Sequence, residues 1–317
     1  MATYDLHKDS YMEIIDMIKT GNVFPFGIEC VSENKITRGI GGTRQVLNKV
    51  MDEIFSTLFK PINNFFCDID ETNDFWNSEE NIDAFATLIA IIIARGCTTP
   101  YHFTPGFLET ITAKKHAMDD LSYYVKMIDY DIYKRTINLQ QSSFHEIDSD
   151  YESKEELYRS VVDKFSNITH LKNIIGHKLN AKFGSYYSRK KTPKEVDIII
   201  GGEYEMDLQK VKNNIYFRTT EYEELWNDFL ACLTKDEMKA MIFLFTNSLS
   251  LDFAVNIYVR NITQDIKIEI CFSEVTIKMS LFDNFESLYR LKLYFCEGCD
   301  DIWDKIIPTP ILTHQHQ

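Results

Sequence analysis

The sequence predicts an α+β protein in which a mostly helical first part is followed by a smaller domain of helices and strands. Apolar residues recur mainly with helical spacing up to about residue 195. Three later segments, which start at Val255, Ile266 and Val275, alternate apolar and polar residues, the period of a strand with one buried face. The 317 residues, of which 44% are hydrophobic, are enough for two separate cores.

Two helices of the first part have clear boundaries. Apolar residues recur at helical spacing between Val46 and Leu58, and Pro61 ends the pattern. Ser78 precedes two glutamates and predicts the N-cap of a second helix, whose apolar face continues to Gly96. Further helices are predicted at 121–127, 157–165 and 171–179.

Two pairs of residues have the spacing of a capping box, in which a hydroxyl and a glutamate satisfy each other's backbone amides. Ser153 with Glu156 predicts the start of the helix at 157–165, and Thr234 with Glu237 predicts the start of a helix in the smaller domain.

The smaller domain is predicted to begin at Gly201 and Gly202, directly after a short β-branched run, VDIII. Two successive residues without side chains form either a hinge or a tight turn. Helices around 225–229 and 238–245 precede the three strands. A final helix is predicted to carry Phe285, Leu288, Leu291 and Phe295.

The charge of the chain argues against nucleic acid and anionic membranes as partners. Lys and Arg number 34 against 48 Asp and Glu, a net charge of -14. The one tight basic cluster, 189–191, is short and is expected to be a solvated loop. The longest aliphatic run, 88–94, is too short to cross a bilayer and predicts a buried helix segment. No secretion signal is recognisable at the N-terminus, so we expect an intracellular protein, cytoplasmic or nuclear.

No sequence motif indicates a cofactor or a metal. Gly-rich phosphate loops, HExxH and GxSxG do not occur. Cys296 and Cys299 have CxxC spacing, with His314 and His316 downstream, and could be zinc ligands or ordinary thiols near a helix end. Since a lone CxxC is a weak signal, we expect no metal site. The seven cysteines are scattered and odd in number, which favours reduced thiols.

Cys271 is the candidate catalytic residue. In the second predicted strand, isoleucines alternate with Lys267 and Glu269, so Cys271 falls in the polar phase while Phe272 turns inward. Free cysteine is among the most buried residue types, so an exposed one invites a chemical explanation. A nucleophilic thiol and an incidental exposed cysteine both fit this pattern.

Five segments resemble HECT-type ubiquitin ligases in their order and spacing. The first looks like the Gly-Gly-x-x-Arg helix that opens the family's N-lobe, and the last is similar to the catalytic Thr-Cys-Phe strand of the family. The segments are IGGTRQVLNKVMDEIF (40–55), NIDAFATLIAIIIARGCTTPYHFTPGFLETI (81–111), EVDIIIGGEYEMDL (195–208), EYEELWNDFLACLTKDEMKAMIFLFTNS (221–248) and ICFSEVTIKM (270–279).

The resemblance implies a bilobal fold and a ubiquitin-transfer activity. It places an N-lobe at 1–200, a hinge at 201–202, a C-lobe at 203–305 and a tail at 306–317. Cys271 would accept ubiquitin as a thioester from a ubiquitin-conjugating enzyme and pass it to lysines of protein substrates. A mobile C-lobe fits two glycines at the junction.

The chain departs from the family pattern in three places. Glu269 and Ile270 replace a His-Thr pair, and the added anion either raises the pKa of the thiol or orients an incoming lysine. The conjugating-enzyme docking region is shortened to about 138–152, and Trp303 is the best candidate for the near-terminal aromatic residue. The first two departures favour an alternative function, an inactive HECT-like adaptor or decoy that binds proteins of the ubiquitin pathway or others.

Overall fold

The computed structural model describes most of the chain outside its C-terminal segment. The described residues are 2–5, 8–21, 28–32, 35–37, 40–63, 65–99, 101–137, 151, 153–183, 191–202, 206, 208–246, 254–269 and 274–297. Within them the protein is predominantly helical with small mixed sheets, so the α+β class is confirmed.

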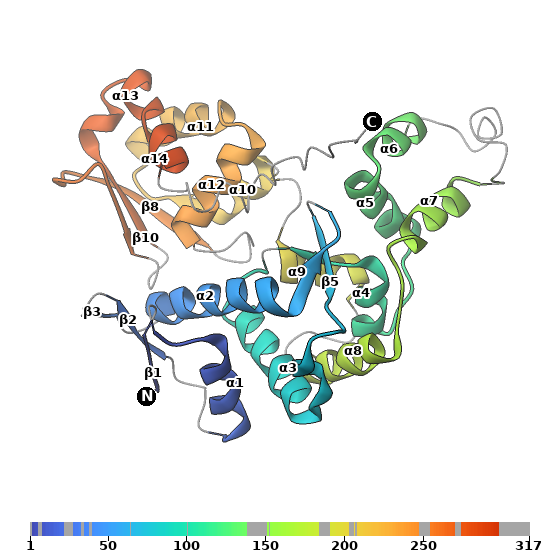
Figure 1. Cartoon of the computed structure of the whole chain (residues 1–317). Helices are drawn as coiled ribbons and strands as arrows, with labels where there is room; N and C mark the ends of the chain where they lie inside the picture. Colours follow the sequence, from blue (N-terminus) through green and yellow to red (C-terminus); the bar gives the residue numbers. More distant parts are fainter. Residues whose placement is uncertain are drawn as a thin grey trace, which may run out of the picture. The chain divides into compact units, whose positions relative to one another are not determined.

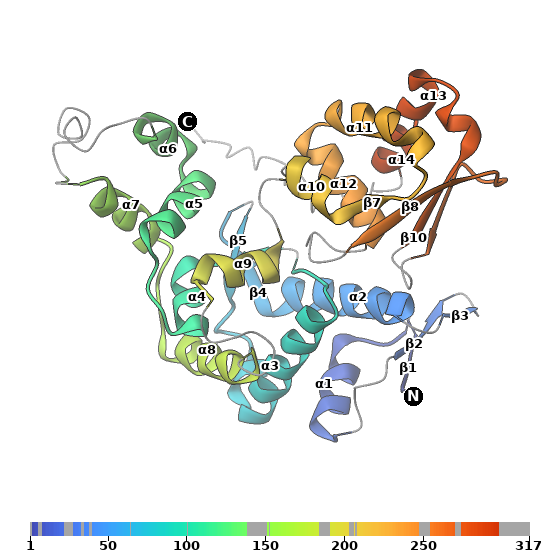
Figure 2. The same ribbon diagram turned by 180° about the vertical axis from the view of Figure 1, so that it is seen from behind.

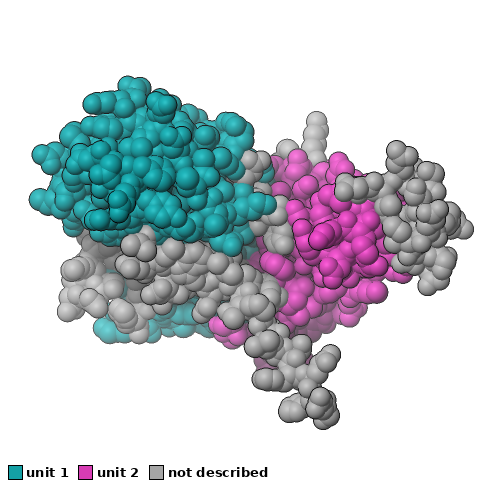
Figure 3. Space-filling model, turned by 90° about the horizontal axis from the view of Figure 1, so that it is seen from above, with its two compact units in different colours: residues 1–55, 92–100, 199–317 teal, residues 56–91, 101–198 magenta. Residues whose placement is uncertain are grey.

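The chain divides into two compact units, coloured separately in Figure 3. Unit 1 comprises residues 1–55, 92–100 and 199–317, and unit 2 comprises residues 56–91 and 101–198. The C-terminal segment is therefore grouped with the N-terminal segment, whereas the sequence-based domains divide at 201–202. The expected N-lobe and C-lobe stay predictions.

The N-terminal part of unit 1 is a small sheet with two helices (Figure 1). Its strands have the order β1-β2-β3, with β1 parallel and β3 antiparallel to β2. Its elements are β1 (Ala2–Asp5), α1 (Tyr11–Lys19), β2 (Ile28–Ser32), β3 (Lys35–Thr37) and α2 (Ile40–Leu58).

The C-terminal part of unit 1 contains a four-stranded sheet with the order β7-β8-β10-β9. Helices lie on one side of this sheet (Figures 1 and 2). A single core cluster of buried residues between Met206 and Phe295 joins the sheet to its helices. The elements are α10 (Leu208–Asn214), β7 (Ile215–Phe217), the 3-10 helix η3 (Thr220–Tyr222), α11 (Glu223–Ala231), α12 (Lys235–Thr246), β8 (Val255–Arg260), β9 (Ile266–Glu269), β10 (Glu274–Lys278), the 3-10 helix η5 (Met279–Phe282), α13 (Phe285–Tyr289) and α14 (Leu291–Glu297).

Unit 2 is mainly helical and has one small sheet, of order β4-β5-β6. Aromatic side chains fill its core: the ring of Phe59 contacts those of Trp76, Phe85 and Phe103. The elements are β4 (Phe59–Pro61), β5 (Phe66–Ile69), the 3-10 helix η1 (Asp74–Asn77), α3 (Glu79–Ala94), β6 (His102–Phe103), α4 (Pro105–Thr112), α5 (Met118–Ile128), α6 (Tyr130–Thr136), α7 (Lys154–Asp163), α8 (His170–Phe183) and α9 (Pro193–Gly201), of which the ends of α3 and α9 are grouped with unit 1.

Most predicted elements are confirmed. The three alternating segments form β8, β9 and β10, and the aliphatic run 88–94 lies inside α3. Among the described residues, no helix has the length and apolar character needed to cross a membrane.

One expectation of the fold was wrong in detail. The final helix is in fact two short helices, α13 and α14, because α13 already ends at Tyr289 with Arg290 as its C-cap. Short strands also accompany the helices of the first 103 residues. They span two to five residues each, too few for a periodic pattern to identify them.

Candidate functional site

The hairpin of β9 and β10 carries the chain segment that includes Cys271. The strands pair antiparallel, with Ile266 opposite Ile277 and Glu269 opposite Glu274. Residues 270–273 therefore join two strand ends whose Cα atoms are about 5 Å apart. Cys271 and Phe272 belong to this connection and lie outside the described residues, so the outward thiol stays a prediction.

The alternation predicted for the second strand is present as far as Glu269. Ile266 and Ile268 are partly buried against the core cluster, whereas Lys267 is exposed. Glu269 lies on the same face as Lys267, and its carboxylate forms an ion pair with the Lys267 ammonium at 2.8 Å. The Glu269 carboxylate is thus on the outer face, and the Lys267 ammonium on the same strand offsets its charge.

Glu274 is a candidate residue that the sequence reasoning missed. It lies directly opposite Glu269 and, among the described residues, its carboxylate has no ion pair. Because Lys267 offsets the charge of Glu269, Glu274 is the carboxylate at this end of the hairpin that can attract a cation such as a lysine ammonium. A signal was present in the sequence: Glu269 and Glu274 lie two residues before and three residues after Cys271, so a turn centred there places them opposite each other.

The two glycines of the expected hinge mark the end of a helix. Gly201 is the last residue of α9, and Gly202 has φ of 84°, which favours glycine. The carbonyl oxygen of Ile200 accepts hydrogen bonds from the Thr99 amide at 2.7 Å and the Thr99 hydroxyl at 3.2 Å. The α9 end is therefore held in place up to Ile200, and any hinge motion begins at the glycines.

Two of the other thiols are unsuited to nucleophilic chemistry. Burial raises the pKa of Cys67 well above its usual value, and nearby Asp68 raises it further. Burial also raises the pKa of Cys97 to about 12, although Arg44 and Arg95 oppose the shift. Because the thiolate is the reactive form, both thiols are inert at neutral pH. Cys232 is a free, exposed cysteine.

The described part of the chain contains no group of three or more His, Cys, Asp or Glu residues that could hold a metal ion. Of the CxxC pair, Cys296 lies in α14, and its side chain, together with Cys299, His314 and His316, lies outside the described residues. Trp303, the tail and nearly all of 138–152 lie outside them as well.

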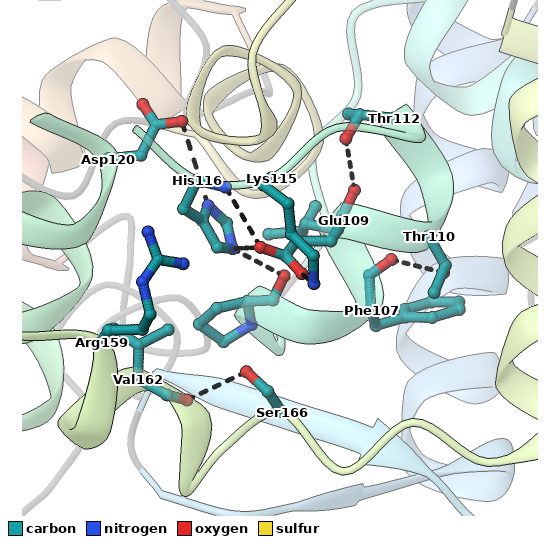
Figure 4. Close-up of polar contacts among 12 residues, drawn as sticks. Phe107, Glu109, Thr110, Thr112, Lys115, His116, Asp120, Arg159, Val162 and Ser166 are labelled. Carbon is teal, nitrogen blue, oxygen red and sulfur yellow. Dashed lines mark hydrogen bonds and ion pairs between the residues drawn. The ribbon is translucent and has the colours of Figure 1, made fainter. Parts of the chain in front are cut away.

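A second polar site lies in unit 2, where α4 is followed by α5 (Figure 4). The Glu109 carboxylate accepts a hydrogen bond from the His116 amide at 3.1 Å and binds the Lys115 ammonium at 2.5 Å. The His116 Nε2 atom is 2.9 Å from the carbonyl oxygen of Pro105. Since a carbonyl oxygen only accepts, Nε2 carries a proton. The buried ring also faces Asp120, with 3.9 Å between Nδ1 and Oδ2.

This unit 2 site fits a structural role better than a catalytic one. Its contacts tie the end of α4 to the start of α5. The adjacent pocket has a volume of about 340 Å³, and none of its lining residues is a cysteine, serine or histidine. They are Gly106, Glu109, Thr110, Ala113, Lys114, Lys115, Ile168 and Asn173. The Thr110 hydroxyl already donates a hydrogen bond to the Phe107 carbonyl oxygen at 2.7 Å.

Comparisons with known proteins do not assign the chain to a family. No protein-family model matches it, and a search of the curated proteins finds no match. A function is therefore inferred from the five segments that resemble HECT-type ligases and from the position of the β9–β10 hairpin at the edge of its sheet.

Proposed function

We propose that the protein is a HECT-type ubiquitin-protein ligase that forms a ubiquitin thioester on Cys271. The observation that carries the proposal is the position of Cys271 between β9 and β10, at one edge of the C-terminal sheet. β9 is the edge strand of this sheet and pairs only with β10 among the described strands.

Three further observations support the proposal. The elements between Met206 and Phe295 have their own core cluster, as a C-lobe requires. A positive-φ glycine, Gly202, separates that core from α9. The segments similar to the family's N-lobe form the helices α2, α3 and α4.

The proposed reaction has two acyl transfers. The Cys271 thiolate attacks the thioester carbonyl of ubiquitin on the conjugating enzyme, the new S–C bond forms, and the enzyme's thiolate leaves. The amine of a substrate lysine then attacks the Cys271 thioester. An isopeptide bond forms, the Cys271 thiolate leaves, and the amine loses a proton to a base or to water.

Glu269 and Glu274 would act in the second step by attracting the substrate ammonium and favouring its approach to the thioester. Glu269 is already paired with Lys267, so Glu274 is the freer carboxylate among the described residues. Neither acid assists the first step, because negative charge disfavours a thiolate.

The alternative is a catalytically inactive HECT-like adaptor or decoy. Two features favour it: Glu269 and Ile270 stand where the family places His and Thr, and the segment at the place of the docking region is short, about 138–152. In this case the surfaces would still bind ubiquitin-pathway proteins, but no thioester would form.

The test mixes the full-length protein with several ubiquitin-charged conjugating enzymes and separates the products on a gel without reductant. We expect an adduct that thiols remove, that is absent in Cys271→Ala, and that Cys271→Ser converts to a thiol-resistant ester. Cys232→Ala is the matched control, because Cys232 is exposed and the adduct should survive its loss. Binding of ubiquitin or a conjugating enzyme without any adduct would instead establish the adaptor.

A further inference from the structure

The outer face of β7 and β8 presents aromatic and cationic side chains together. Ile215 and Phe217 of β7 and the alternate residues of β8 that start at Val255 contact the core, so the intervening residues point away from it. Parallel pairing sets Tyr216 beside Asn256. We call this set the β7–β8 outer face; it consists of Tyr216, Arg218, Asn256, Tyr258 and Arg260.

Both arginines of this face are held by stacking. The Arg218 guanidinium lies 5.1 Å from the centre of the Tyr216 ring, and its Nε donates a 2.7 Å hydrogen bond to Asn256 Oδ1. The Arg260 guanidinium lies 4.7 Å from the centre of the Tyr258 ring. Such contacts fix the planar groups before a ligand arrives, and preorganisation lowers the entropic cost of binding.

The two guanidiniums still have binding capacity. Arg218 and Arg260 are exposed, and neither forms an ion pair with a described carboxylate. Arg218 uses Nε for Asn256, which leaves the two terminal nitrogens to bind an acceptor. Tyr216 is 45% exposed, which is high for a large aromatic side chain. In a chain of net charge -14, this face therefore attracts anions.

We propose that the β7–β8 outer face binds an extended, acidic segment of a partner protein. The Arg218 amide donates to the Ile257 carbonyl oxygen at 2.8 Å, which continues the parallel ladder and places Arg218 beside Tyr258. Arg260 is two residues further along β8, so the two arginines are about 8 Å apart by strand geometry. Alternate residues of an extended peptide are about 7 Å apart, so acidic residues at every second position match the pair.

The rest of the outer side carries charges of both signs. Glu269 and Glu274 lie there with Lys267 and Lys278; Glu274 is paired with Asn256, and Lys278 with Arg260. A long phosphate backbone crossing the sheet would approach both carboxylates in a chain of net charge -14, whereas a short peptide over β7 and β8 approaches only Glu274. The inference goes beyond the proposed function and does not depend on Cys271.

The experiment measures fluorescence anisotropy with the full-length protein at physiological ionic strength. The probe is a labelled peptide of alternating Asp and Ser, compared with its Asn-Ser counterpart and with a labelled single-stranded DNA. We expect the Asp-Ser peptide to bind more tightly than the other two. The Arg218→Gln, Arg260→Gln double variant should weaken it at least about tenfold, since each arginine loses charge-assisted hydrogen bonds.

Two further variants keep the result interpretable. Arg290→Gln removes an exposed arginine outside this face and should leave the affinity unchanged. Arg218→Lys, Arg260→Lys keeps the charge but loses the planar fork, so it should still weaken binding even if the glutamine variant fails to fold. Equal affinity of wild type and both double variants would overturn the proposal. Arginine-dependent binding that is tighter for DNA than for the peptide would also overturn it.

Discussion

Arg44 donates a hydrogen bond from Nη1 to the carbonyl oxygen of Thr246, 3.0 Å away and 202 residues later in the chain. Its Nε donates a second one, also of 3.0 Å, to the carbonyl oxygen of Arg95. The side chain is almost fully buried. Arg44, which follows Gly41 and Gly42 after one residue, thus binds the last residue of α12 and the turn after α3 within unit 1.

Loss of this arginine should destabilise the protein strongly. Arg44→Met fills similar space but leaves one buried and one partly buried carbonyl oxygen without these donors, so we expect the free energy of unfolding to fall by about 3 kcal/mol. Urea denaturation followed by circular dichroism measures the change. Arg290→Met, at an exposed position, is the control and should stay within about 0.5 kcal/mol of wild type. Equal stability of the two variants would contradict the assigned role of Arg44.

The ion pair between Glu237 and Lys292, 2.6 Å long, should make stability depend on pH. Burial raises the pKa of Glu237, but hydrogen bonds from Lys292 and Thr234 outweigh it and lower the pKa below its ordinary value of 4.5. Lys292 shows the opposite shift: mainly because it donates a hydrogen bond to Glu237, its pKa is raised above the ordinary lysine value of 10.5. The ion pair therefore stabilises the fold fully between about pH 4.5 and pH 10.5, the ordinary pKa values of the two groups.

Glu237→Gln should lose about 1 kcal/mol of stability near neutral pH. A lowered acid pKa gives stability that is present above pH 4.5 and disappears as the pH falls through the folded value, so the gap between wild type and variant should close in acid. Denaturation curves over a pH series measure this gap. A stability difference between wild type and Glu237→Gln that grows below pH 4.5 would be inconsistent with the lowered pKa of Glu237.

The described cysteines should differ in reactivity. Cys67 and Cys97 are buried with raised pKa values, so we expect alkylation only after unfolding. Exposed Cys232 should react in the native protein. Mass spectrometry of peptides after timed iodoacetamide treatment resolves each site. Rapid native alkylation of Cys67 would show that its surroundings open far more readily than the core packing implies.

Gly202 should tolerate substitution poorly. Its φ of 84° strains any residue with a Cβ, so Gly202→Ala should cost about 1 kcal/mol or more of folding free energy. Gly21 is a matched control, because its φ is 68° and a Cβ there would meet open space. Gly21→Ala therefore measures backbone strain alone. Thermal denaturation of both variants gives the comparison, and an unchanged Gly202→Ala would remove the conformational reason for a glycine.

Local signals of the sequence predict the helix starts and strands well. The capping box at the start of α12 is confirmed: the Thr234 amide donates to the Glu237 carboxylate at 2.8 Å, and the Glu237 amide donates to the Thr234 hydroxyl at 3.2 Å. The alternation from Val255 and Ile266 is likewise a property of a few adjacent residues, and it predicted β8 and β9.

One local signal was missed, and one feature depends on distant pairing. The β-branched run 196–200 lies in α9, which begins with a capping box: the Thr192 amide donates to the Glu195 carboxylate at 2.7 Å, and the Glu195 amide donates to the Thr192 hydroxyl at 3.2 Å. At the candidate site, the sequence predicts both strands beside Cys271. The opposition of Glu269 and Glu274 depends on the position of the turn; the alternation within each strand does not fix that position, and only the spacing of the two residues on either side of Cys271 indicates it.

The central claim is that Cys271 accepts ubiquitin, and intact mass spectrometry tests it most directly. The full-length protein is exposed to a panel of ubiquitin-charged conjugating enzymes without reductant and then weighed. We predict a species heavier by one ubiquitin that reverts on addition of thiol and is missing for Cys271→Ala. No added mass with any donor, or an adduct that persists in Cys271→Ala, would contradict the account.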